Sequence, residues 1–463
     1  MNEKHQGRME TMKRIIAQML VWVILLGAGT AAAEGAGAHS WDYDLRLHLE
    51  TEAFSRRERD HLQGYADLLE ILELKGNLAW CGETRSMELK TDLIPVSNPA
   101  SRIDFRIRGI PEMVEISSPL LGQEEICFNP PGLMYIARRG WETFRLPLQH
   151  LVLLYPGTTT FAFKCLTEAW NAEIDPLRAG GVIPRESIDR IAEEWRALLG
   201  ANTELNLWIN ALTDPLDNGS ELSAEIRELP EVLLNCTDEN GLAIQAEEGS
   251  LRWLNGTGKV LYEERKSGKE TLQALTLPKD TGYCTPSFRL YTAETETGLR
   301  TELEAEWARG SGETDDCLVR FRFRAEGLPT EYPAEAAFSG EISLEGFLLP
   351  NFHFLFSGKT SPEGKARVDV AQAGQPEAGT VFSCEGSIVP AQRQEPPAYT
   401  YEELIKRFNI FSLNDQSLHE LVSVVDRPLA AGLINFLYEL PVSSCQSIMD
   451  DLEDGGIIQL LLK

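Results

Sequence analysis

The sequence predicts an α+β protein with two antiparallel β-sheet domains packed with helices and a C-terminal helical tail. Three patterns support this prediction. Residue type alternates with a period of two through most of 287–389, and a second set of alternating runs lies between Tyr43 and Ile116. Amphipathic patterns separate these runs, most clearly from Arg185 to Leu199. A period of two is typical of strands with one buried face, whereas a period of 3.6 is typical of helices.

Residues 1–33 are predicted to be a signal peptide that precedes the fold. Lys13 and Arg14 lead into an apolar run, 15–26, and three alanines, 31–33, offer the small residues of a cleavage site. The alternative is a retained membrane anchor, but the run is short of the ~20 apolar residues that a spanning helix needs. We therefore expect cleavage near Ala33, an extracytoplasmic location (secreted or in the cell envelope), and no transmembrane segment in the mature chain.

Residues 40–215 are predicted to form the first domain, a sheet covered by helices. Alternation from Tyr43 to Thr51 indicates a strand, and an amphipathic helix is expected at 56–69. Further alternating runs bring the expected number of strands before Pro119 to at least five. From there the pattern changes, and helices are expected at 133–138, 146–154, 158–170, 185–199 and 205–213.

Residues 216–390 are predicted to form the second domain. A cluster of Asp, Pro, Asn and Gly at 214–220 is typical of a boundary. A helical stretch at 220–236 then precedes a long antiparallel meander. Its strands are expected near 250–254, 259–264, 271–277, 299–307, 319–325, 336–346, 351–357, 365–370 and 380–389.

One hairpin of this meander has a register that the charges themselves predict. Glu302, Glu304 and Glu306 share the polar face of one strand, and the next strand carries arginines at 320, 322 and 324 on its own polar face. Cross-strand pairs of opposite charge favour the register that places these two stripes side by side. Because surface pairs of this kind are ordinary, we read the three glutamates as a solvated face rather than as the two carboxylates of a glycosidase.

Residues 391–398 are predicted to be a Pro- and Gln-rich linker, and 399–463 a helical tail. Thr400 and Glu403 fit a capping box for a helix that runs to Asn409. The last apolar run, 457–462, is expected to add to a sheet edge or to pack in a groove of the first domain, because it is too apolar to be left in water.

The net charge of −28 and the eight cysteines limit the classes of partner and of chemistry. The negative charge repels nucleic acids and anionic membrane surfaces. An even number of cysteines in an exported chain favours disulfides, while buried thiols are the equally weighted alternative. The predicted domains would pair their cysteines fully only if Cys445 of the tail reached the first domain.

No motif assigns a catalytic, cofactor-binding or metal-ligating residue. The Gly-Thr-Gly-Lys sequence at 256–259 lacks the first glycine and the Ser or Thr of a phosphate loop, so a hairpin turn is expected there. The acidic run 450–456 lacks the ligands of a calcium loop at two positions. The histidines show no zinc spacing.

One stretch of the meander is apolar on both faces and forms the candidate binding surface. A central strand covered on both sides by helices explains such a run. An apolar surface for a lipid-like ligand or a protein partner explains it too. The candidate residues are Phe338, Ile342, Leu344, Phe352, Phe354 and Phe356.

By fold-level analogy alone, a long antiparallel sheet with helices on its apolar face is similar to the half-barrel carriers that shuttle lipids or lipoproteins outside the bacterial cytoplasm. The expected function is that of an exported, non-enzymatic envelope protein that binds an apolar, lipid-like ligand or an envelope protein, with no cofactor. One alternative is a secreted hydrolase whose carboxylate or histidine site assembles only in the fold. Another is a structural or assembly factor without a ligand site.

Overall fold

The computed structural model describes much of the chain from residue 38 onward, in separate stretches. They are 38–53, 56–81, 86–110, 113–121, 125–129, 170, 172, 180–201, 205–206, 209–210, 219–278, 284–309, 317–346, 352–373, 380–391, 408–410, 427–428, 431–432 and 434–447.

The protein is mostly an open antiparallel β-sheet, with 56% of the structure in strands, a few helices and a small helical C-terminal tail. It divides into two compact units that interleave along the chain. Unit 1 comprises 1–159, 331–337 and 356–463, and unit 2 comprises 160–330 and 338–355. The domains predicted from the sequence, 40–215 and 216–390, are continuous instead, and that division stays a prediction.

Unit 1 is built on a sheet whose strands follow the order β17–β18–β1–β2–β3–β4–β5–β6–β19. All neighbours are antiparallel except β6 and β19, which are parallel. As predicted, five strands precede Pro119. The strands are β1 (Ala38–Leu49), β2 (Leu72–Cys81), β3 (Ser86–Pro95), β4 (Ile103–Ile110), β5 (Met113–Ser117), β6 (Ile126–Phe128), β17 (Lys365–Gln372), β18 (Thr380–Pro390) and β19 (Phe408–Ile410).

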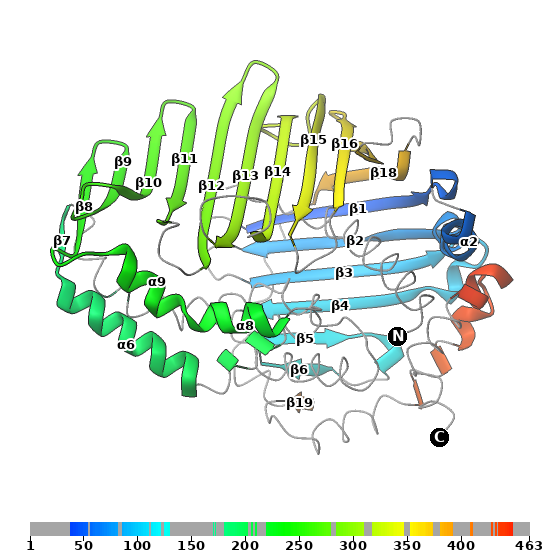
Figure 1. Ribbon diagram of the computed structural model, residues 1–463. Helices are drawn as coiled ribbons and strands as arrows, with labels where there is room; N and C mark the ends of the chain where they lie inside the picture. Colours follow the sequence, from blue (N-terminus) through cyan, green and yellow to red (C-terminus); the bar gives the residue numbers. More distant parts are fainter. Residues whose placement is uncertain are drawn as a thin grey trace. The chain divides into compact units, whose positions relative to one another are not determined.

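Helical segments connect the strands of unit 1. The predicted helix at 56–69 is present as α2 (Arg56–Ile71), whose Leu62 is fully buried. Short 3-10 turns follow the strands at η1 (Thr51–Ala53), η2 (Pro99–Ser101) and η3 (Pro119–Leu121). In Figure 1 the C-terminal helical residues lie beside α2.

Unit 2 is a meander in which each strand pairs with the next, in the order β7–β8–β9–β10–β11–β12–β13–β14–β15. Figure 1 shows these strands side by side, and tight turns join β8 to β9, β9 to β10, β10 to β11 and β12 to β13. The strands are β7 (Gly181–Ile183), β8 (Leu242–Glu247), β9 (Ser250–Asn255), β10 (Val260–Ser267), β11 (Glu270–Thr276), β12 (Cys284–Thr295), β13 (Gly298–Arg309), β14 (Cys317–Leu328) and β15 (Ala336–Glu345). The next strand, β16 (Phe352–Thr360), gives its residues up to Leu355 to this unit.

Three helices of unit 2 pack against this sheet: α6 (Arg185–Ala201), α8 (Gly219–Arg227) and α9 (Leu229–Cys236). Helices were predicted at 185–199 and 220–236, and both predictions are confirmed. In one core cluster, α6 and α9 pack on β8 and β10 through residues such as Ile188, Val232 and Leu242. In a second cluster, α6 and α8 pack on the start of β12, where Cys284 is buried.

The hairpin predicted from the charges is confirmed in its register. Glu302 lies opposite Arg324, Glu304 opposite Arg322 and Glu306 opposite Arg320. The register shifts near each end of the hairpin, between Leu299 and Thr301 and between Trp307 and Ala308. Each shift means that one strand has an extra, unpaired residue at that point. Such an extra residue bends the strand and increases its local twist.

The predicted tail differs from the structure at one point. Phe408 and Asn409, the last two residues of the helix expected here, lie instead in β19, which pairs with β6 in parallel, while the earlier part of that helix, 400–407, lies outside the described residues. A short strand gains its hydrogen bonds from a partner far away in the sequence, which local helix propensity does not reveal. The predicted helices at 133–138 and 146–154, and the apolar run 457–462, lie outside the described residues.

Candidate interaction surface

The apolar surface predicted from the sequence is largely part of the core. Ile342, Phe354 and Phe356 are buried, and Phe338 and Leu344 are half-buried. Phe352 lies in β16, and its side chain lies outside the described part. Buried side chains fill a core without needing a ligand. As a binding surface for an apolar ligand, this stretch therefore stays a prediction.

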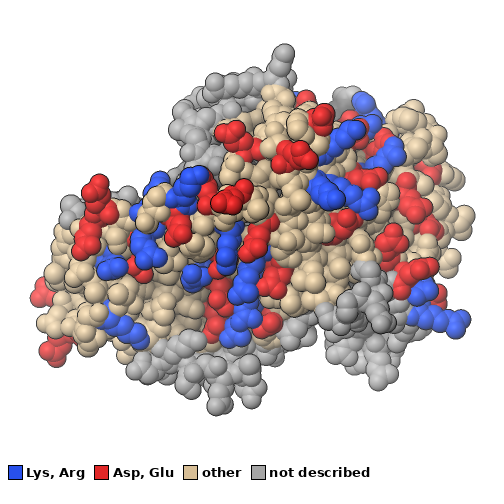
Figure 2. Space-filling model, turned by 90° about the horizontal axis from the view of Figure 1, so that it is seen from above, with Lys and Arg blue, Asp and Glu red and all other residues tan. Residues whose placement is uncertain are grey.

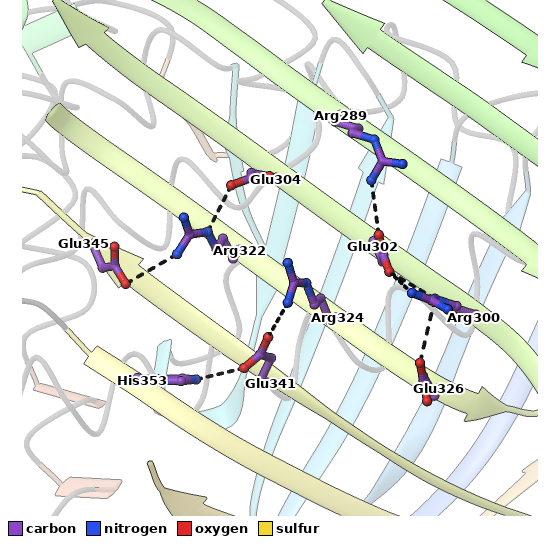
Figure 3. Close-up of polar contacts among 10 residues, drawn as sticks. All are labelled: Arg289, Arg300, Glu302, Glu304, Arg322, Arg324, Glu326, Glu341, Glu345 and His353. Atoms are coloured by element: carbon purple, nitrogen blue, oxygen red, sulfur yellow. Dashed lines mark hydrogen bonds and ion pairs between the residues drawn. The ribbon is translucent and has the colours of Figure 1, made fainter. Parts of the chain in front are cut away.

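The other face of the meander carries a network of ion pairs. Figure 2 shows basic and acidic side chains next to one another over the face in view. In Figure 3 each of the four arginines drawn contacts at least one carboxylate. The ion pairs drawn are Arg289–Glu302 (3.1 Å), Arg300–Glu302 (2.5 Å), Arg300–Glu326 (3.7 Å), Arg322–Glu304 (2.9 Å), Arg322–Glu345 (3.7 Å), Arg324–Glu341 (3.2 Å) and His353–Glu341 (3.1 Å).

This network shows what the three glutamates of the stripe at 302–306 do in the fold: each pairs with an arginine. The hydrogen bond from Arg300 is the main cause that holds the pKa of Glu302 below its ordinary value. Glu304 and Glu306 each contact the arginine directly across the strand pair. Because both signs of charge lie side by side, the face presents no single-sign field for a charged ligand. The predicted pairing of these glutamates with arginines is confirmed, but the predicted solvation is uneven, because the side chains of Arg320 and Glu306 are only 16% and 12% exposed.

A second group of charges, in unit 1, is buried. Glu88, Arg108 and Glu115 stand directly opposite one another on β3, β4 and β5, and their exposed fractions are 4%, 7% and 1%. Arg108 Nε lies 3.3 Å from Glu88 Oε1, and Arg108 Nη1 lies 3.3 Å from Glu115 Oε1. Arg106 adds a further contact to Glu88 at 2.5 Å. The planar guanidinium of arginine carries several N–H donors, so Arg108 can contact the carboxylates of Glu88 and Glu115 at the same time.

This cluster belongs to a buried row that crosses the sheet of unit 1. The paired residues run from Ser40 on β1 through Ala79, Glu88, Arg108 and Glu115 to Cys127 on β6. All six are buried. Sequence reasoning gave Glu88, Arg108 and Glu115 no role and so missed the cluster. The pairing register is the signal that reveals it, because the register aligns opposite charges across three strands.

The described part of the chain contains several cysteines and histidines and many carboxylates. There, no three His, Cys, Asp or Glu side chains come together in a way that could hold a metal ion. Cys127, Cys384 and Cys445 carry free thiols. The free Cys445 thiol donates to Leu437 O at 3.2 Å within the tail, so the pairing with the first domain that full oxidation would require is not formed.

The tail segment, residues 434–447, is anchored to unit 1 by polar contacts. Glu439 Oε1 accepts hydrogen bonds from Asn98 Nδ2 at 2.8 Å and from Ser101 Oγ at 3.1 Å. The Ser443 hydroxyl donates to the Asp67 carboxylate of α2. The contact with α2 is close, because a Cβ on Gly64 would lie 2.1 Å from Ser447 Oγ and 2.5 Å from Ser443 O. The inner face of the tail segment is therefore fixed in place.

The outer face of the same segment exposes large apolar side chains. Ile434 is 53% exposed, Tyr438 84% and Val442 83%. These three residues, which we call the apolar stripe, are four positions apart along the chain. A helical hydrogen bond from Tyr438 N to Ile434 O sets the first interval, and helical structure resumes after Pro441. Soluble proteins normally bury such side chains or use them in interfaces.

The tail segment departs from the usual helix pattern, because it buries serines and also exposes large apolar side chains. Its buried side combines the polar residues Ser444 and Ser447 with the apolar Leu440, while Glu439 and Ser443 are half-buried. Amphipathic helices more often turn apolar residues inward and polar residues outward. The sequence predicted a helical tail here but not this orientation. The serines at 443, 444 and 447 are the signal that could have revealed it, because small residues permit the close approach to Gly64.

Comparisons with known proteins add no relative: no family model, no curated protein and no solved structure matches the chain. None of the helices that the structure describes is both long and apolar enough to cross a membrane.

Proposed function

We propose that this chain is an exported, non-enzymatic protein of a bacterial envelope that binds an envelope protein partner through the apolar stripe. The export part of this proposal rests on the leader-like residues 1–33. The finer architecture, two helix-packed domains with half-barrel curvature, also remains part of the proposal. The observation that carries the binding function is the outward display of Ile434, Tyr438 and Val442.

The exposure of the apolar stripe favours binding, because keeping large apolar side chains in water costs free energy that burial against a partner would recover. Burying a large apolar side chain stabilises a protein by ~1.5–3 kcal/mol relative to leaving it in water. Turning the tail segment over would expose the buried Leu440 and break the polar bonds of Glu439 and Ser443, so the stripe stays outward. Tyrosine is also enriched among the residues that dominate binding energy at interfaces.

A protein partner fits the stripe better than a lipid-like ligand does. Sites for small apolar ligands are concave and enclose most of the ligand. Tyr438 and Val442 are more than four-fifths exposed, so they project from the surface rather than line a pocket. The net charge of −28 also disfavours the anionic surface of a membrane. A hydrophobic groove or strand edge on another protein offers the matching shape.

The proposal is tested by placing charge on the stripe. Tyr438→Glu and Val442→Glu change exposed side chains, so we expect the melting temperature to stay near that of the parent chain. We expect each to reduce the amount of partner that co-purifies from the exporting host by roughly tenfold or more, as for a hot-spot residue. Val182→Glu is the matched control, because Val182 of β7 is 55% exposed in the other unit. Equal partner recovery from all variants would overturn the proposal.

A further inference from the structure

Two Asn-Gly pairs of unit 2, Asn240-Gly241 and Asn255-Gly256, lie close to Asp238. The first belongs to the turn before β8, and the second to the turn that joins β9 to β10. In such a pair the glycine nitrogen can attack the side-chain amide carbon of the asparagine, because glycine has no Cβ to hinder the approach. The attack closes a five-membered succinimide ring. Both pairs share this local chemistry, so a difference between them comes from their surroundings in the fold.

At Asn240-Gly241 the fold occupies the attacking nitrogen. The Gly241 N–H donates to Asp238 O at 3.0 Å. The glycine is also tightly packed, because a Cβ there would lie 2.0 Å from Ile183 O. The Asn240 N–H donates to the Asp238 carboxylate at 2.8 Å, which fixes the turn further. The Gly241 nitrogen can reach the Asn240 side chain only if this turn opens, so the fold protects the pair.

At Asn255-Gly256 the attacking nitrogen is available. Gly256 is exposed, and among the described residues its N–H has no hydrogen-bond partner. A carboxylate lies against this glycine, because a Cβ on Gly256 would be 2.2 Å from each of the two Asp238 carboxylate oxygens. A positioned carboxylate can take the amide proton as a general base. Asp238 therefore holds one glycine nitrogen through its backbone oxygen and has its carboxylate beside the other.

The side chain of Asn255 is held and polarised for this attack. Its Oδ1 accepts hydrogen bonds from Thr257 Oγ1 at 2.7 Å and from Lys259 N at 2.9 Å. Both donors follow Gly256 in the chain, so they hold the side-chain amide over the turn that contains the Gly256 nitrogen. Donors in such positions stabilise the negative charge that develops on Oδ1 when the nitrogen attacks. The Asn255 backbone is fixed as well, because its oxygen accepts from Gly258 N at 2.8 Å.

We propose that Asn255 is a self-modification site, at which the folded chain converts this asparagine into aspartate or isoaspartate. The Gly256 nitrogen bonds to Asn255 Cγ and the Cγ–Nδ2 bond breaks. The side-chain nitrogen leaves as ammonia with the proton that Gly256 gave up. Water then opens the succinimide at either carbonyl, so water is the co-reactant that the conversion consumes. Each conversion adds one negative charge to the β9–β10 turn, and isoaspartate also inserts an extra carbon into the backbone there.

The test compares the two pairs in the purified chain, kept folded at pH 8 in water enriched in oxygen-18. Peptide mass spectrometry is expected to find the side-chain amide of Asn255 replaced by a carboxyl group with one heavy oxygen. This change is expected at least roughly tenfold faster than at Asn240, since a single oxyanion donor can contribute more than that. The same incubation in denaturant is the control, and there the two pairs are expected to react at similar rates.

Two substitutions test the parts assigned to individual groups, with the melting temperature as the check on folding. Thr257→Val removes a donor to Oδ1 and nearly keeps the size of the side chain, so it is expected to slow the reaction at Asn255 severalfold and to leave Asn240 unchanged. Asp238→Asn removes the base and is expected to slow the reaction at Asn255 by roughly tenfold or more.

The comparison within the parent chain decides the proposal even if a variant fails to fold. An Asn255 side chain that keeps its amide, or equal rates at Asn255 and Asn240 in the folded chain, would overturn it. If Thr257→Val and Asp238→Asn both fold and react at the parent rate, the fold does not activate Asn255, and the proposal is also wrong. The proposal is independent of the apolar stripe, so none of these outcomes bears on partner binding.

Discussion

At the scale of single residues, the buried thiols of Cys127 and Cys384 give the most direct check on the core of unit 1. Burial is the main cause that raises the pKa of Cys127 to about 11 and that of Cys384 to about 12. Because the thiolate is the nucleophile, roughly a thousandth or less of either group is reactive at pH 8.

We therefore predict that a maleimide at pH 8 leaves both thiols unmodified in the folded chain. Peptide mass spectrometry after a short exposure measures this, and the same reaction in denaturant is the control that shows both cysteines are reduced. Rapid native labelling at either position would mean that the strands carrying them, β6 and β18, are not packed as described.

The buried charge cluster leads to a prediction about stability. Arg108→Met would leave Glu88 and Glu115 buried without the guanidinium that lies between them. Breaking a buried ion pair by removing one partner costs about 3–5 kcal/mol. Denaturant unfolding should show a loss of that size. Arg324→Met is the matched control, since its ion pair with Glu341 is exposed and should contribute less than ~1 kcal/mol. Equal effects would contradict the buried arrangement.

At this scale the sequence predicted some residues well and others not at all. The arginine and glutamate stripes of 302–306 and 320–324 were predicted because charge and alternation agree within one hairpin. Glu88, Arg108 and Glu115 were not predicted, because alternation alone cannot tell a wet face from a covered one. Burial on both faces of a sheet depends on segments far away in the sequence.

At the scale of elements, the contact between α2 and the tail segment rests on a glycine. Gly64 lies inside α2, where alanine would favour the helix by ~0.5–1 kcal/mol. We predict the opposite outcome for Gly64→Ala, because the new Cβ would meet the backbone oxygen of Ser443. Amide hydrogen exchange in 442–447 should rise and the melting temperature should fall.

Gly200→Ala is the matched control for this change. Gly200 also lies in a helix, α6, and a Cβ there would meet nothing within 4 Å. This substitution should leave stability unchanged or raise it by up to ~1 kcal/mol. If the two alanine variants behaved alike, the tail segment would not pack against Gly64 as described.

Elements with strong local periodicity were predicted from the sequence, whereas long-range pairings were not. The helix at 56–69, the helix at 185–199 and the paired strands of the meander follow from local pattern. The pairing of β1 with β18 joins Trp41 to Pro390, and no local pattern signals it. The parallel strand β19 escaped prediction for the same reason.

At the scale of the whole molecule, the chain is acidic, its two units interleave along the sequence, and arginines and glutamates pair with one another on one face of the meander of unit 2. On the part of the chain that the structure describes, the unusual feature is the polar anchoring and apolar display of the tail segment. Of the predicted binding surface from Phe338 to Phe356, three of the five side chains that the structure describes are buried, so that surface stays a prediction. Exposure, which decides between core and interface, is a property of the folded chain and is not visible in the sequence.

The measurement that tests the central claim most directly is photo-cross-linking in the exporting host, with p-benzoylphenylalanine at position 438 or at the control position 182. We predict a discrete cross-linked product of higher mass from position 438 that contains one envelope protein, and none from position 182. Adding Val442→Glu should abolish that product. No product from position 438, or the same products from both positions, would contradict the claim that the apolar stripe binds a partner.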